Sequence, residues 1–286
     1  MRLLYIAALL AICPTLAHAQ ADGPVLSARA ADPTVSLKLW NTTGHLRIVG
    51  WDKDSVVVRG FVGRGNQFTM VGAGSAIKVM IENSNPSSPA ASNIVVYFPR
   101  HGKVAVKAVS SDIAATDASG WFYSASGSIR LSGTVSSAEV ESVSGSIDLD
   151  VTTPWLRART GDGHLILRGA PEDADVATIG GALDIAARGI ARGQFGSVSG
   201  DIRFAGTPPR GAILDFSNHS GAVDLMLPSD VSAAVMLSSV AGGIENGFTQ
   251  VRPASQSPRA LRLNLGLGES QLTARSFKGT IRIRPQ

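Results

Sequence analysis

The chain has almost no cysteine: its 286 residues include one, Cys13. That residue lies in an N-terminal segment, residues 1–19, that has the three parts of a secretory signal peptide. These are a positively charged start, an apolar run over Leu3–Ile12 and a small-residue cleavage site ending at Ala19. Cleavage would leave a mature chain without disulfide or thiol chemistry. The alternative is a lipoprotein lipidated at Cys13, which we disfavour because Ile12 is too bulky for that processing site.

The sequence also has few charged residues and no long helical periodicity. Charged residues make up 17% of the chain, glycine is abundant at 31 residues, and no long amphipathic helical pattern occurs. This composition excludes a coiled coil and favours an all-β structure. Removing the leader and its one arginine lowers the net charge from +4 to +3 (4 − 1), a surplus too small to indicate nucleic-acid binding. No later segment approaches the ~20 apolar residues that a membrane-spanning helix needs.

Motifs for catalysis or cofactor binding are missing. The sequence has no G-x-S-x-G elbow, no H-E-x-x-H pair, no P-loop, no G-x-G-x-x-G loop and no cysteine pair for zinc. The histidines after the leader are His45, His101, His164 and His219, and their spacing matches no set of metal ligands. His45 and His164 hold the same position, directly after a glycine, which indicates a surface turn. We therefore expect no enzyme, no cofactor and no metal site.

What the chain does contain is a repeated phrase: a small residue, a glycine, and then alternating apolar residues. One copy is Ser126-Gly127-Ser128-Ile129-Arg130-Leu131. The glycines of the phrase are Gly127, Gly145, Gly163, Gly181, Gly200, Gly221 and Gly242. They are separated by 18, 18, 18, 19, 21 and 21 residues. A fixed period of about 20 residues is typical of a stacked repeat.

The pattern around each glycine predicts two short strands. The alternation after it has period two, which indicates a strand with one buried face. The glycine itself should supply a positive φ or a corner where a Cβ atom would clash. Five positions earlier, an inward column is expected: Phe122, Val140, Ala158, Val176, Phe195, Phe216 and Leu237. The sequence therefore predicts a single elongated β-solenoid of about ten two-stranded coils with an 18–21-residue repeat, roughly 45–50 Å long.

The repeat also divides the chain into segments. After the leader we expect a flexible lead-in at residues 20–34 and a solenoid at 35–286. Within the solenoid, the expected parts are irregular N-terminal coils at 35–109, regular coils at 110–245 and C-terminal coils at 246–286.

The ends of the stack need cover, because open strand edges pair with other chains. We expect residues 35–58 to cap or splay at one end and the strand ending at Arg284 to be a charged edge at the other. Residues 83–93 and 250–259 are loops by composition, and Leu261–Leu263 should fill a coil that lacks its glycine.

The order of these motifs resembles a known family. A Gly-Trp-Asp turn follows the strand after Gly44, and a strand ends in proline and a basic turn at Tyr97–Gly102. The repeated coils come next, then a strand ending at Pro228 and a final G-x-I-x-I strand beginning at Gly279. Together they resemble the bacterial "putative adhesin" family, the DUF4097 domain, over about residues 35–284. The resemblance implies an exported or envelope-associated β-solenoid and brings no catalytic residues.

One outward face of the predicted coils carries alternating charge. Its column, taken along the repeats, is Arg130, Asp148, Ile166, Asp184, Arg203, Asp224 and Glu245. We expect Arg130 to lie over Asp148, and Arg203 between its two neighbouring aspartates. Such a ladder contributes stability instead of catalysis, because an active site gathers carboxylates of like charge.

A second outward face carries the candidate ligand site. Six and four positions before successive glycines stand two aromatic, two acidic and two basic residues: Trp121 and Tyr123, Glu139 and Glu141, Arg157 and Arg159. Glu139 should lie beside Arg157, and Glu141 beside Arg159. The alternatives are a solvated face held by cross-coil pairs and a ledge on which the aromatic rings stack against a sugar.

These observations predict an exported, non-enzymatic binding module of adhesion or structural type in the bacterial envelope. It would lie in the periplasm or at the cell surface, and its partner would be an envelope protein or a glycan. One alternative is a carbohydrate-active β-helix enzyme, which three or more acidic groups converging in a groove would indicate. Another is a sensory or assembly partner in an envelope-stress system, which would show protein interaction without turnover.

Overall fold

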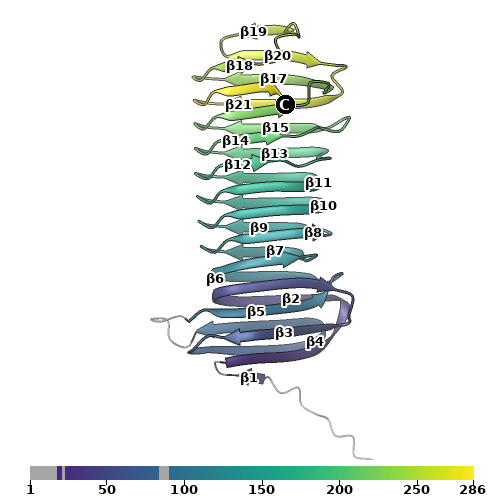
Figure 1. Ribbon diagram of the computed structural model, residues 1–286, viewed down its shortest axis with the longest axis vertical. Helices are drawn as coiled ribbons and strands as arrows, with labels where there is room; N and C mark the ends of the chain where they lie inside the picture. The colour runs from purple at the N-terminus through teal and green to yellow at the C-terminus, as the bar shows by residue number, and fades with distance from the viewer. Residues whose placement is uncertain (1–17, 21–22, 84–89) are drawn as a thin grey trace, which may run out of the picture.

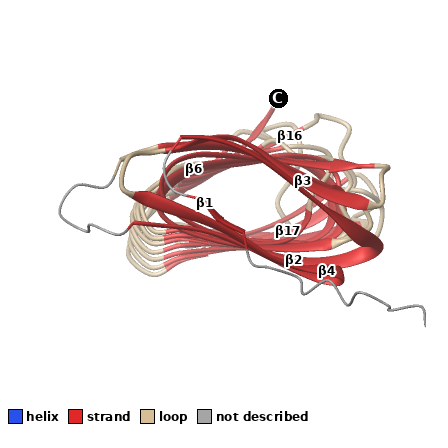
Figure 2. Ribbon diagram, turned by 90° about the horizontal axis from the view of Figure 1, so that it is seen from below, coloured by secondary structure: helices blue, strands red, loops and turns tan. Residues whose placement is uncertain are grey.

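The computed structural model describes residues 18–20, 23–83 and 90–286. All secondary-structure elements in these ranges are β-strands, and the strands stack into a long rod (Figure 1). Seen along the rod, they form two facing layers joined by turns at both sides (Figure 2). The protein is thus all-β with a β-solenoid-like fold, as predicted from the repeat. Apart from residues 18–19, the predicted signal peptide lies outside the described residues.

The N-terminal end is built around one long strand, β2. Its strands are β1 (His18–Gln20), β2 (Gly23–Trp51), β3 (Ser55–Val62), β4 (Asn66–Asn83) and β5 (Ser92–Pro99). On one side, the second half of β2 runs parallel to β4 and β5. On the other side it runs parallel to β6 (Lys103–Thr116). The second half of β2 therefore lies inside the stack, and not at its end.

The predicted lead-in at residues 20–34 was wrong for the part that the structure describes. Residues 23–34 belong to β2, and Gly23–Ala30 pairs antiparallel with β3. Val25 and Ala31 are buried against the apolar side of this pair. The segment is ordered because β3 satisfies its backbone hydrogen bonds and Val25 is buried in the core. The cap expected at 35–58 is accordingly formed by residues 23–30 with β3.

The central coils follow the chain in order. Their strands are β6, β7 (Ser119–Ser124), β8 (Ile129–Thr134), β9 (Ala138–Ser142), β10 (Ile147–Thr160), β11 (Leu165–Thr178), β12 (Leu183–Ile185), β13 (Arg192–Ser197), β14 (Ile202–Ala205), β15 (Ile213–Asn218) and β16 (Val223–Leu227). Each pairs in parallel with its counterpart one coil away, so that Ile147 lies opposite both Ile129 and Leu165. All seven residues of the predicted inward column are at most 2% exposed, which confirms the predicted register.

The repeat glycines mark a close approach between coils. A Cβ atom built on Gly163 would lie 2.0 Å from the carbonyl oxygen of Gly145, and the same clash recurs along the column. Among the described glycines with positive φ, none belongs to the seven predicted turn glycines. Of the two reasons offered for glycine, steric exclusion is therefore correct and positive φ is wrong. Gly44, upstream of the column, has both features.

The C-terminal coils do not follow the chain in order. Their strands are β17 (Ala233–Ser239), β18 (Ile244–Asn246), β19 (Ser255–Ser257), β20 (Ala260–Leu265), β21 (Ser270–Ser276) and β22 (Ile281–Pro285). The last two strands insert between earlier ones: β21 pairs in parallel with both β15 and β17. In the same way β22 lies between β16 and β18. In Figure 1 the yellow C-terminal strands accordingly lie below β17 and β20.

Two expectations about this end were wrong. The strand ending at Arg284 is no free edge, because it is paired on both sides. Leu261–Leu263 fills no parallel coil; it belongs to β20, which runs antiparallel to β17 and covers the end of the stack together with β19. The chain reverses direction in the tight turn between β19 and β20, where Ser257 stands opposite Ala260 and its hydroxyl accepts a hydrogen bond from Ala260 N.

Candidate ligand-binding face

The six predicted site residues lie on three adjacent strands of one layer. Trp121 and Tyr123 belong to β7, the two glutamates to β9 and the two arginines to β10. In the parallel register Trp121 stands opposite Glu139, and Glu139 opposite Arg157. Tyr123, Glu141 and Arg159 form a second row beside the first. The alternation of each strand points both rows outward, while Phe122 between the aromatics is fully buried.

The two aromatic rings form a stacked pair, which we call the aromatic ledge. The centroids of Trp121 and Tyr123 are 5.8 Å apart, with 13° between the ring planes. Three other aromatic rings are covered by cations of the chain itself: Lys107 lies over Trp40, Arg59 over Tyr97 and Lys53 over Trp51. Within the described residues, no cation lies over Trp121 or Tyr123. Their ring faces are thus not occupied by the protein's own cation–π contacts.

The charged residues beside the ledge are only partly paired with each other. Arg157 contacts Glu139 at 3.5 Å, as predicted. Arg159 stands next to Glu141 in register, but its ion pair is with Asp175 of β11, at 2.8 Å. In the described part of the chain Glu141 takes part in no ion pair. The face therefore offers one carboxylate acceptor next to the ledge.

A shallow groove begins at Tyr123 and runs along the corner of the coils. It has a volume of about 420 Å³ and is lined by Tyr123, Glu141 and Arg159, with Val143 and Ile179 at its apolar side. Val143 is 57% exposed and Ile179 60% exposed, so the apolar wall is open to solvent. The groove joins an aromatic ring, a carboxylate and a guanidinium to exposed aliphatic surface. This is the combination that binds a sugar or a polar chain with one apolar side.

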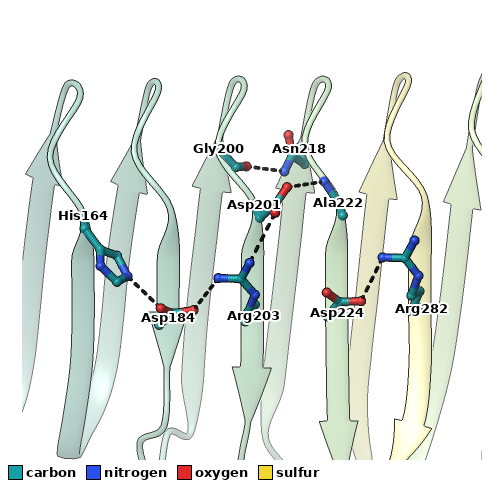
Figure 3. A network of polar contacts seen from close by, with 9 residues as sticks. All are labelled: His164, Asp184, Gly200, Asp201, Arg203, Asn218, Ala222, Asp224 and Arg282. Carbon is teal, nitrogen blue, oxygen red and sulfur yellow. Dashed lines mark hydrogen bonds and ion pairs between the residues drawn. The ribbon is translucent and has the colours of Figure 1, made fainter.

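The opposite layer carries the charge ladder, in a form different from the prediction. Arg203 contacts Asp184 at 3.3 Å and Asp201 at 3.4 Å, and stands opposite Asp224 in register (Figure 3). Asp224 instead contacts Arg282, at 3.4 Å. Arg282 comes from the inserted strand β22 and also contacts Glu245. Its hydrogen bond to Glu245 and the charge of that carboxylate raise the pKa of Arg282.

The start of the predicted ladder also differs. Arg130 stands opposite Asp148 in register, but the ion pair of Asp148 is with Arg168 of the next strand. Arg168 lies on β11, and its long side chain reaches back across the strand spacing to Asp148. Three carboxylates of the described ladder, Asp148, Asp184 and Asp224, are thus each met by an arginine.

The two histidines that follow a glycine each contact an aspartate. His164 Nε2 lies 2.6 Å from Asp184, and His45 Nε2 lies 3.5 Å from Asp112. Burial alone would raise the pKa of Asp112, but two hydrogen bonds donated by Ser128, with the nearby charges of His45 and Arg130, lower it below its ordinary value. In the described ranges no group of three or more His, Cys, Asp or Glu could hold a metal ion.

One column of buried polar residues was not predicted from the sequence. Three positions before each repeat glycine stands a buried Ser, Thr or Asn: Ser124, Ser142, Thr160, Thr178, Ser197, Asn218 and Ser239. Apart from Ser197, which bonds Thr178, these side chains hydrogen-bond the backbone of the corner. For example, Asn218 donates to Gly200 O at 2.8 Å and accepts from Gly221 N at 3.0 Å. The sequence does contain this signal, as a hydroxyl or amide residue at a fixed offset from each glycine. These side chains satisfy the hydrogen bonds of the backbone at the corner.

Comparison with known proteins gives a family and distant structural likenesses. The model of a family described as Toastrack DUF4097 matches residues 41–284. A putative adhesin from Bacteroides fragilis and a putative lipid binding protein from Parabacteroides distasonis are each 12% identical with a TM-score of 0.49, covering 91% of this chain and 96% of their own. A putative cell adhesion protein from Clostridium sporogenes is 10% identical with a TM-score of 0.24, covering 92% of this chain and 100% of its own. A search of curated proteins found no match.

In the described residues no helix is long and apolar enough to cross a membrane.

Proposed function

The chain belongs to the Toastrack DUF4097 family, and on this premise we propose that it is an exported, non-enzymatic binding module of the bacterial envelope, of adhesion type. The ligand is a glycan, bound on the outward face of β7, β9 and β10. One observation carries this proposal: Trp121 and Tyr123 form a stacked pair of partly exposed rings that no cation of the described residues covers. Half-exposed aromatic rings beside polar hydrogen-bonding groups suit the apolar face and hydroxyl rim of a sugar.

The rod supports this role because it holds the face flat and rigid. We infer coils of 18 to 21 residues in the central stack, supported by the register in which Ile147 pairs with Leu165 and Leu183 with Ile202. Every coil is fixed by strand pairing on both sides and by a shared core, so a ligand meets a surface that needs little ordering on binding.

The distribution of carboxylates favours binding over catalysis. Hydrolysis of a glycosidic bond needs two carboxyl groups placed across one site. On this face, Glu139 is paired with Arg157 and Asp175 with Arg159, each across one strand spacing. The paired arrangement holds the strands together and leaves Glu141 to accept hydrogen bonds from sugar hydroxyls.

The predicted leader supports export. Its residues 1–17 lie outside the described range, while residues 18–20 form β1, which pairs antiparallel with β4. Cleavage after Ala19 would remove two of the three β1 residues, so we infer that the mature rod begins with β2. N-terminal sequencing of the protein purified from the periplasm or the medium should give a start near Gln20, and an uncleaved protein in the cytoplasm would contradict export.

A glycan array tests the proposed function. We expect the mature protein to bind a defined subset of glycans and the Trp121→Ala/Tyr123→Ala variant to lose that signal. The matched control is Met236→Ala/Ser238→Ala, because those residues hold the same positions six and four before Gly242 at the far end of the rod. An unchanged profile in the Trp121→Ala/Tyr123→Ala variant would refute the ledge.

A further inference from the structure

Lysines gather on one side of the aromatic ledge. Lys103 and Lys107 lie on β6, which pairs directly with β7, so that Lys107 stands opposite Tyr123. Lys38 lies on β2, the next strand, and Lys78 on β4, the strand after that. Four of the six lysines of the chain are therefore on three adjacent strands of the same layer. We call these four residues the lysine patch.

The lysine patch is not neutralised by the protein. Among the ion pairs of the described residues, none includes a lysine. Lys38 and Lys78 stand directly opposite each other in the parallel register, an arrangement of like charges that destabilises a sheet. On the other side of the ledge, by contrast, Arg157 and Arg159 both have carboxylate partners. The positive charge of this face is thus concentrated on one side of Trp121 and Tyr123.

Aromatic rings extend into the lysine patch and form one surface with it. Lys107 Nζ lies 5.1 Å from the ring centroid of Trp40. A groove of about 270 Å³ runs past Trp121 from β6 to β10, and its lining includes Lys103, Glu139 and Trp155. Lysines and aromatic rings therefore share the strands from β4 to β7, with Trp155 beyond them on β10, and at about 4.8 Å per strand spacing this face extends over roughly 24 Å.

We propose that the ligand of this face is an anionic polysaccharide, with its acidic groups on the lysine patch and its sugar rings on the aromatic ledge. This rests on the proposed function and adds the charge class of the glycan. The argument is charge complementarity: uncompensated ammonium groups attract anions, and the adjacent rings select for a ligand with flat apolar faces. A membrane surface fits less well, since Trp40, Trp121 and Tyr123 are half-buried against the sheet instead of protruding as apolar anchors.

The test compares three probes with the mature protein in low-salt buffer. They are polygalacturonate, a uronic-acid polymer; dextran, a neutral one; and vesicles of phosphatidylglycerol. We expect binding to polygalacturonate alone, weakening as salt is added because exposed charges are screened. The variant Lys38→Glu/Lys103→Glu should raise the Kd by roughly tenfold or more. The control Lys278→Glu changes an exposed lysine near the other end of the rod and should leave the Kd unchanged.

The outcomes separate this inference from the proposed function. Binding of dextran and polygalacturonate with equal affinity, lost in Trp121→Ala/Tyr123→Ala but not in the lysine variant, would overturn the anionic class and leave glycan binding in place. Binding of vesicles without polygalacturonate would overturn it in favour of a lipid headgroup. If the glycan array and these probes all show no binding, both proposals fail. Circular dichroism of each variant establishes that the fold is kept.

Discussion

Replacing one repeat glycine with alanine should disrupt the stack, although the change adds only a methyl group. In Gly163→Ala the new Cβ atom would start 2.0 Å from Gly145 O, and an ordinary contact begins at 3.4 Å, so the two coils must separate locally by about 1.4 Å (3.4 − 2.0). That atom belongs to the backbone and cannot rotate away. The backbone bonds from Ile147 N to His164 O and from Leu165 N to Ala182 O, both 2.9 Å, would lengthen as a result.

The expected cost is about 3 kcal/mol, the upper end of the range for overpacking, since two coils must move instead of one side chain. For a chain of this size that corresponds to a melting temperature lower by roughly 6–12 °C, which thermal circular dichroism measures. The matched control is Gly196→Ala on β13. Its Cβ atom would meet nothing closer than Ala177 Cβ at 3.8 Å, so we expect a change of less than about 1 kcal/mol. Equal melting temperatures for the two variants would refute the argument from close approach.

Three further predictions follow from other parts of the rod. Asn218→Ala removes three corner hydrogen bonds, to Gly200 O and from Ser220 N and Gly221 N, and should lower the free energy of unfolding by about 1–3 kcal/mol in urea titrations; a loss no larger than that of a surface mutation would contradict it. Truncation that removes β21 and β22 should give an unfolded or aggregated protein in size-exclusion chromatography, because it opens the stack between β15 and β17. Asp112 has a lowered pKa, so its carboxylate contributes stability at neutral pH that is lost as the pH falls below about 4. Asp112→Asn should therefore flatten the acid side of the stability–pH curve, and an unaltered curve would show that Ser128 and His45 do not favour the charged form.

The register of the central coils could be predicted because two independent periods agree. Alternation with period two identifies the buried residues of each strand, and the glycine fixes where each strand begins. Residues such as Val140 and Ala158 are consequently paired and buried as expected. The order of coils at the two ends could not be predicted in this way. A glycine shows that a residue lies at a corner, but not which other coil lies against it.

The same limit explains the outcome for the candidate site. Adjacent coils of the central stack place Trp121, Glu139 and Arg157 side by side, and the repeat was sufficient to predict that. The lysine patch depends on β2 being next to β6, and these strands are far apart in sequence. The period around Lys38 is interrupted by β3, β4 and β5, so no spacing rule connects it with Lys107. The half of the face that carries the positive charge was therefore visible only in the structure.

The charges of the opposite layer contain information about the order of the C-terminal coils. If the coils stacked in sequence order, Asp224 and Glu245 would occupy neighbouring coils at the same position, and like charges directly opposite each other destabilise a sheet. In the structure β22 inserts Arg282 between them, at 3.4 Å from Asp224 and 2.9 Å from Glu245. The insertion converts a repulsive pair into an alternating row that continues the contact of Arg203 with Asp184. In a stacked fold, two like charges at equivalent positions of successive repeats thus indicate that another strand lies between them.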